Sequence, residues 1–143
     1  MQKVAILQGA GMDMRGKVQI DIFGPDTLDV INARIARDAA AVDLLADVFQ
    51  SNDEAEAVAW IQGLHAQEYV AGIINPSGFT ATDGLLPETI AASQVPFYEV
   101  HASNPSARDV RSKILPVCVG GVCGFGYAGY GVALRSIRLT LDA

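Results

Sequence analysis

A glutamate and a histidine near residue 100 have the spacing that acid–base chemistry requires. Glu99 and His101 stand two residues apart in the segment VPFYEVHASN, residues 95–104, which predicts a short buried strand. Side chains two apart on a strand point to the same face, so the carboxylate can fix the tautomer and orientation of the imidazole. Imidazole exchanges its proton near neutral pH, and His101 is therefore a candidate general acid or base. The alternative is a histidine hydrogen-bonded for packing alone.

A second polar cluster follows the most apolar predicted strand. In the segment NPSGFT, residues 75–80, proline and glycine favour a turn that leaves amide and hydroxyl groups to face a ligand. Asn75 either holds a substrate hydroxyl or carboxylate, or only satisfies the backbone of its own turn. Arg108 and Arg111 follow the histidine and carry the charge that an anionic substrate requires, unless both are solvated at the surface.

The elements that must position these residues alternate between strands and helices. Val- and Ile-rich runs predict five strands, at residues 4–8, 45–50, 70–74, 97–100 and 117–122. Stretches of helical period predict a helix capped by Asp26 or Thr27, one after residues 51–53, a shorter one near 88–93, and a last one over 127–141. This pattern is typical of an α/β protein with a flavodoxin-like, doubly wound, five-stranded parallel sheet and helices on both faces.

Sheets of this class bind ligands beyond the carboxyl ends of their strands. Polar loops at residues 9–25, 75–83 and 101–105 are expected there. The first is about 17 residues long, a length common in lids and binding loops.

Composition restricts the class of protein further. The chain has 143 residues, half of them apolar, which predicts a single domain over residues 1–143. A net charge of -6 argues against nucleic acid and anionic membrane surfaces as partners. No signal peptide or membrane span is evident, so we expect a cytoplasmic protein. Cys118 and Cys123 lack the second half of a zinc motif, and we expect buried free thiols and no metal.

Taken together, short motifs along nearly the whole chain resemble type II 3-dehydroquinate dehydratase. They are Gly9 and Gly16, Ile22-Phe23-Gly24, Gln50-Ser51-Asn52, Ile74-Asn75-Pro76, Thr80 with Thr82, Glu99-Val100-His101 followed by Ser103-Asn104, Ala107-Arg108, and residues 120–130. The resemblance implies a flavodoxin-like fold and loss of water from 3-dehydroquinate through an enolate, in shikimate or quinate metabolism. It also implies no cofactor or metal, and a homo-oligomer built from trimers, commonly a dodecamer.

The resemblance assigns roles to individual residues. His101 matches the acid that protonates the departing hydroxyl, Glu99 its orienting carboxylate, and Asn75 the amide that positions substrate and a catalytic water. Ser103 matches the contact to the substrate carboxylate. Further matched positions are Asn104, Thr80 and Arg111 for substrate binding, and Glu88 for an inter-subunit contact.

Four matched positions depart from the family pattern. Phe23 stands where the family has its tyrosine base, Val18 replaces the lid arginine, Gly11 replaces an asparagine and Ala81 a histidine. Loss of a positioned base costs about 10²- to 10⁴-fold in rate, so efficient turnover of 3-dehydroquinate is not expected. Gly11 and Ala81 would enlarge the pocket enough for a bulkier hydroxy acid or cyclic ketone.

Two functions therefore remain open. The first is a lyase with a changed substrate or mechanism, in which Asp13 or Asp21 of the long first loop replaces the base. The second is a non-catalytic family member that binds a small carboxylate or serves as an assembly subunit. Survival of the group around Glu99 and His101 favours the enzyme, because a protein that needs only to fold does not require it.

Overall fold

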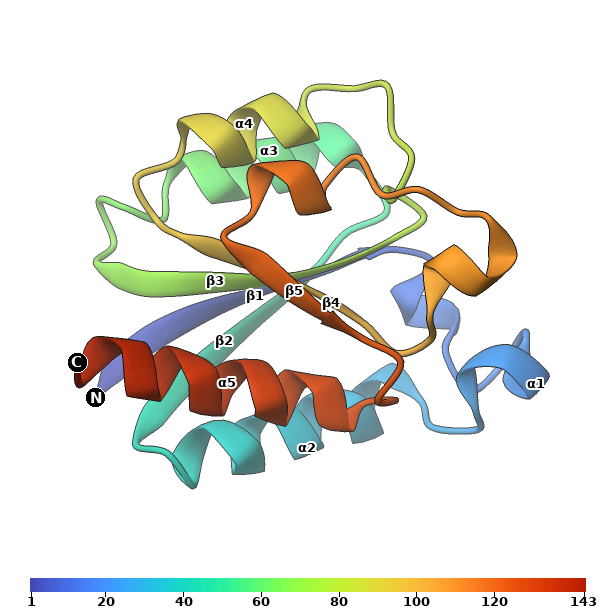
Figure 1. Ribbon diagram of the computed structural model, residues 1–143, viewed down its shortest axis with the longest axis horizontal. Coiled ribbons are helices and arrows are strands. Elements are labelled where there is room, and N and C mark those ends of the chain that lie inside the picture. The colour runs from blue at the N-terminus through green and yellow to red at the C-terminus, as the bar shows by residue number, and fades with distance from the viewer.

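The computed structural model describes all 143 residues and contains one parallel sheet of five strands. The strands are β1 (Gln2–Ala10), β2 (Leu44–Gln50), β3 (Tyr69–Ser77), β4 (Phe97–His101) and β5 (Gly120–Cys123). Their order is β2-β1-β3-β4-β5, and every neighbouring pair is parallel (Figure 1). This is the strand order of the flavodoxin-like doubly wound fold, which confirms the predicted fold class.

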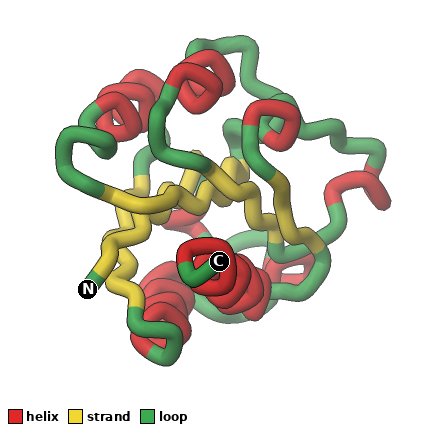
Figure 2. Tube along the Cα trace, turned by 60° about the vertical axis from the view of Figure 1, so that its left-hand side comes forward, coloured by secondary structure: helices red, strands yellow, loops and turns green.

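Helices cover both faces of the sheet. Helices α2 (Leu28–Ala40) and α5 (Ala128–Leu141) lie on one face, and α3 (Glu54–Gln62) and α4 (Leu86–Ala92) on the other (Figures 1 and 2). Alternate residues of β1 serve the two faces: Val4 and Ile6 belong to the core under α2 and α5, and Ala5 and Leu7 to the core under α3 and α4. The middle of β1, Val4–Leu7, is buried on both sides and is therefore apolar.

Polar groups fix where the helices begin. The Thr27 hydroxyl accepts a hydrogen bond from Val30 N, so one of the two predicted caps of α2 is confirmed. The Asp53 carboxylate accepts one from Ala55 N, and α3 begins after residue 53 as predicted. Helix α4 has no capping side chain of its own. Instead Glu54, at the start of α3, accepts a hydrogen bond of 2.9 Å from Leu86 N. One carboxylate thus joins the beginnings of two neighbouring helices.

Two strand boundaries differ from the sequence-based prediction. Strand β3 continues to Ser77, because Asn75 pairs with Gln8 and Ser77 with Ala10; the segment that begins at Asn75 is therefore strand before it is turn. The predicted fifth strand begins too early. Residues Leu115–Val117 form a 3₁₀ helix, because the Ser112 hydroxyl accepts hydrogen bonds from the backbone N–H groups of residues 114 and 115.

The long first loop contains two short helical turns, Met12–Met14 and α1 (Ile20–Phe23), at the carboxyl ends of the strands. The chain termini lie at the opposite end of the molecule (Figure 1). There Arg138 of α5 donates a hydrogen bond of 3.2 Å to the Gln2 side chain of β1. None of the helices combines the length and apolar character that crossing a membrane requires.

Candidate active site

A pocket of about 430 Å³, here called the inner pocket, lies at the carboxyl ends of β1, β3 and β4. In a sheet of order β2-β1-β3-β4-β5, connections leave in opposite directions from β1 and β3, which opens a crevice between them. All three polar loops predicted to meet there contribute to its wall. The side chains that line it and can bind or react include Arg15 and Phe23 from the first loop, Asn75, Ser77 and Thr80 from β3 and its loop, and His101, Ser103 and Arg108 from the end of β4.

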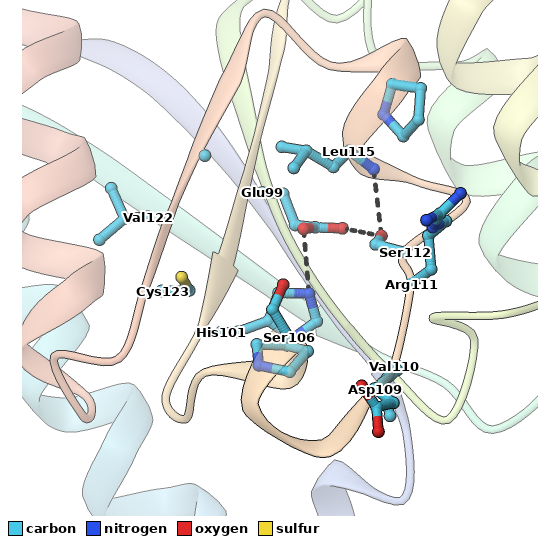
Figure 3. Close-up of a pocket in the computed structure, with 13 residues that line it drawn as sticks. Glu99, His101, Ser106, Asp109, Val110, Arg111, Ser112, Leu115, Val122 and Cys123 are labelled. Atoms are coloured by element: carbon cyan, nitrogen blue, oxygen red, sulfur yellow. Dashed lines mark hydrogen bonds and ion pairs between the residues drawn. The ribbon is translucent and has the colours of Figure 1, made fainter.

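His101 is held from behind by a buried carboxylate. Its Nε2 lies 3.0 Å from Oε1 of Glu99, which is only 3% exposed. This distance allows an ion pair, but the Nε2–H does not point at the carboxylate well enough for a hydrogen bond. The other oxygen of Glu99 accepts a hydrogen bond of 2.5 Å from the Ser112 hydroxyl (Figure 3). The expected alignment of Glu99 and His101 on one strand face is therefore present.

Asn75 is oriented by a chain of buried hydrogen bonds. Its Nδ2 donates to the Tyr130 hydroxyl at 2.9 Å, and that hydroxyl donates to Gln8 Oε1 at 2.6 Å. Burial raises the pKa of Tyr130, so the phenol stays protonated and keeps its donor role. Because the Asn75 amide nitrogen is engaged on the inner side, its oxygen is available to the pocket. The Asn75 side chain therefore bonds to Tyr130 and lines the inner pocket.

Of the predicted binding residues, Ser103 and Thr80 line the inner pocket and Asn104 and Arg111 do not. Ser103 accepts a hydrogen bond of 2.9 Å from Arg108, which also lines the pocket. The Thr80 hydroxyl donates to the Ser77 carbonyl at 2.6 Å. Asn104 is exposed. The nearby arginine is therefore Arg108 and not the predicted Arg111.

Arg111 instead lines a second cavity beside β5, of about 640 Å³, here called the edge cavity (Figure 3). Glu99, Ser112 and Cys123 line it as well, and His101 stands in the wall that separates it from the inner pocket. The edge cavity is the larger of the two. We place the chemistry in the inner pocket because Asn75, Ser103 and the first loop reach only that side of His101.

The two carboxylates predicted as replacement bases do not line the inner pocket. Asp13 accepts a hydrogen bond of 3.2 Å from Asn52, which draws it towards the loop after β2. Asp21 is exposed on α1. No Asp or Glu lines the inner pocket, and His101 is the one lining side chain that can accept a proton.

Of the four positions that depart from the family pattern, Phe23, Val18 and Gly11 line the inner pocket, and Ala81 is exposed outside it. Glu88 is exposed on α4, away from this pocket. The structure holds no group of three or more His, Cys, Asp or Glu side chains suited to a metal.

The sequence pointed to Arg15 only through the length of its loop. The guanidinium is buried, donates from Nη2 to the Ser77 hydroxyl at 3.3 Å, and lies 3.7 Å from the centre of the Phe23 ring. Burial lowers the pKa of Arg15, and the neighbouring Tyr127 and Tyr130 hydroxyls oppose that effect. Arg15 and Phe23 therefore lie against each other in the lining of the inner pocket.

The Glu99 carboxylate holds the His101 imidazole, and the Asn75 amide lines the same pocket as His101. At the carboxyl ends of a flavodoxin-like sheet, such a group of residues is suited to acid–base chemistry. The sequence model of the class II dehydroquinase family matches residues 2–138, and this chain belongs to that family.

Individual relatives support this assignment. A 3-dehydroquinate dehydratase of Laribacter hongkongensis is 36% identical over 146 residues, covering 100% of this chain and 94% of that protein. One of Brucella canis is 36% identical over 138 residues, covering 94% and 87%. The type II dehydroquinase structure from Propionibacterium acnes shares the fold, with a TM-score of 0.90, 24% identity and 97% of both chains covered. A 3-dehydroquinate dehydratase-like protein from Bifidobacterium longum has a TM-score of 0.76 and 28% identity, with both chains fully covered.

Proposed function

We propose that the protein is a carbon–oxygen lyase that removes water from 3-dehydroquinate, or from a related small hydroxy or keto carboxylate, through an enolate. The observation that carries this proposal is that His101 and Asn75 line one pocket without acidic side chains, while Glu99 holds His101 from behind that pocket. Relatives named 3-dehydroquinate dehydratase, similar over the whole chain, support the same reaction.

The elimination has two proton transfers, which the pocket serves unequally. A base takes the proton next to the carbonyl, and the electron pair moves onto the carbonyl oxygen as an enolate. Collapse of the enolate breaks the bond to the departing hydroxyl, to which His101 gives its proton, so that water leaves. His101 and Asn75 suit the second step. For the first step Phe23 has no phenol oxygen to act as base.

We therefore infer that the reaction differs from that of an ordinary family member. A positioned base contributes about 10²- to 10⁴-fold, and turnover of 3-dehydroquinate is expected to be lower by a factor of this order. Removal of the proton then falls to a water molecule or requires a substrate with a more acidic proton.

A second candidate is a family member that binds a small carboxylate without turnover. The absence of any Asp, Glu or Tyr from the pocket lining favours it. The two candidates differ in whether product forms, and not in whether ligand binds.

The test follows conversion of 3-dehydroquinate by the absorbance of its conjugated product. We expect slow turnover that the His101→Ala variant loses while it still binds the substrate in calorimetry. The Phe23→Tyr variant should gain about tenfold or more, because the Arg15 guanidinium against the ring would favour the phenolate. Turnover by the unaltered protein at an ordinary family rate contradicts the inferred loss of the base, and binding without turnover supports the second candidate.

A further inference from the structure

Arg15 is a buried cation without a counter-ion. The residue is only 7% exposed, yet it takes part in none of the ion pairs of the structure. Its Nε and the hydroxyl of Tyr127 are both buried and form no hydrogen bond of good geometry, although the two side chains are close enough to interact. A buried guanidinium without a carboxylate partner is costly for a folded protein. The Phe23 ring offsets only part of that cost through a cation–π contact.

The surroundings of Arg15 set the sign of what the inner pocket accepts. Although the chain carries a net charge of -6, two arginines and a histidine line this pocket and no acid does. The two arginines come from different walls. Arg108 stands beside Ser103 at the end of β4, and Arg15 stands beside Ser77 at the end of β3. A single carboxylate held by Ser103 and Arg108 would leave the Arg15 charge unanswered.

We propose that Arg15 is a specificity-determining residue that receives a second anionic group of the ligand, so that the protein prefers small ligands with two negatively charged groups. The inference rests on the proposed function in taking the inner pocket as the ligand site. In it, Ser103 and Arg108 hold one carboxylate. The second anionic group accepts hydrogen bonds from the Arg15 guanidinium, whose planar face stacks on Phe23. The charge balance of the pocket is completed by the ligand and not by the protein.

A matched set of ring acids tests the preference without turnover. The probes are cyclohexanecarboxylate and the 1,2-, 1,3- and 1,4-cyclohexanedicarboxylates, which present the second group at different separations. Calorimetry on the full chain should give at least one dicarboxylate a Kd about tenfold or more below that of the monocarboxylate, as a charge-assisted hydrogen bond predicts. In the Arg15→Met variant this advantage should disappear, while the Kd of the monocarboxylate stays within about threefold.

Arg37→Met is the matched control, because Arg37 is exposed on α2 and its replacement removes the same charge. This control should keep the preference for the dicarboxylate. If no dicarboxylate binds the unaltered protein more tightly than the monocarboxylate, or if Arg15→Met and Arg37→Met reduce the preference equally, the proposal is wrong.

Thermal unfolding separates ligand binding from a purely structural role. Without ligand, the Tm of Arg15→Met should equal or exceed that of the unaltered protein, because an unpaired buried charge is removed. A structural arginine would give a clear loss of Tm instead, which would contradict the proposal. Failure of the dehydratase assay leaves these binding outcomes intact, so the two proposals can fail separately.

Discussion

The position of His101 depends on residues that lie outside the inner pocket. Glu99 holds His101 at 3.0 Å, and Glu99 is in turn fixed by the Ser112 hydroxyl. The same hydroxyl accepts two backbone hydrogen bonds from the turn before β5. The orientation of His101 is thus coupled to the turn that precedes β5.

Replacement of Ser112 by alanine should lower kcat for the dehydration by about tenfold, with KM little changed, because Glu99 loses its fixed orientation. Steady-state kinetics by product absorbance measures both constants. Ser112→Thr keeps the hydroxyl and should recover most of the loss. Ser106→Ala is the control, since Ser106 also lines the edge cavity but has no hydrogen bond to Glu99 (Figure 3). An equal loss in both alanine variants would argue against the positioning role.

Part of this site could be predicted from residue spacing and part could not. The interval of two between Glu99 and His101 places them on one strand face in any strand, so that pair was predictable. Arg15, Ser112 and Tyr130 reach the site only through contacts between distant segments, such as the hydrogen bond from Ser112 to Glu99. The positions of the candidate replacement bases could not be predicted for the same reason. Asp13 has a partner, Asn52, that is 39 residues away in the chain and draws it elsewhere.

Among the elements, α4 depends most on a neighbour. Its first turn has a free N–H at Leu86, which the Glu54 carboxylate of α3 accepts, and the Thr82 hydroxyl donates to the same carboxylate. No capping side chain precedes α4 in sequence, so its beginning at Leu86 instead of residue 88 could not be inferred from local residues.

The Glu54→Ala variant should therefore lose about 1 to 2 kcal/mol of unfolding free energy, as expected for removal of a helix cap. Urea denaturation followed by circular dichroism measures the change. Glu56→Ala is the control, because Glu56 is an exposed residue in the same first turn. A loss of the same size in both variants would show that charge near the beginning of α3, and not the cap of α4, is responsible.

The alternation of strand and helix segments was sufficient to predict a parallel sheet, because the segment between one strand and the next carries the chain back across one face of the sheet to the start of that next strand. The apolar stripe of the last helix was equally reliable: Tyr130, Leu134 and Ile137 are all buried. The start of β5 was not predictable, because residues 117–119 are as apolar as a strand, while the Ser112 hydroxyl and Pro116 favour the 3₁₀ helix before it.

For the molecule as a whole, tyrosine ionisation should set the alkaline limit of stability. Burial raises the pKa of Tyr69 to about 12, together with its hydrogen bond to Asp47, and burial also raises the pKa values of Tyr127 and Tyr130. The unfolded chain then releases these protons first, near pH 10, and binds fewer protons than the folded chain. The contribution of these tyrosines to the unfolding free energy should be fully present below that pH and fall as the pH rises towards 12, and the Cys118 thiol, whose pKa burial also raises, adds to the fall.

Denaturant unfolding at a series of pH values from neutral to strongly alkaline measures this fall. Tyr69→Phe should be less stable at neutral pH, where it lacks the 2.7 Å hydrogen bond to Asp47, but should lose stability less steeply under alkali. An unchanged slope in this variant would contradict the role of Tyr69. A single cooperative transition is expected if residues 1–143 form one domain, as we propose.

Assembly into trimers and dodecamers stays a prediction, as does the inter-subunit role of Glu88. Its exposed position on α4 is compatible with contact to a neighbouring subunit. Light scattering of the purified protein measures its molar mass in solution and hence the number of subunits. A monomer at working concentrations would contradict the prediction.

The position of the chain ends has a practical consequence. Met1 precedes β1 at the amino ends of the strands, and α5 returns the chain to the same side, as the contact between Arg138 and Gln2 records. The inner pocket opens at the opposite ends of those strands. Either terminus can therefore carry a fluorescent reporter or an attachment to a sensor chip without shielding the pocket. Such immobilised protein would allow the carboxylate probes to be screened directly.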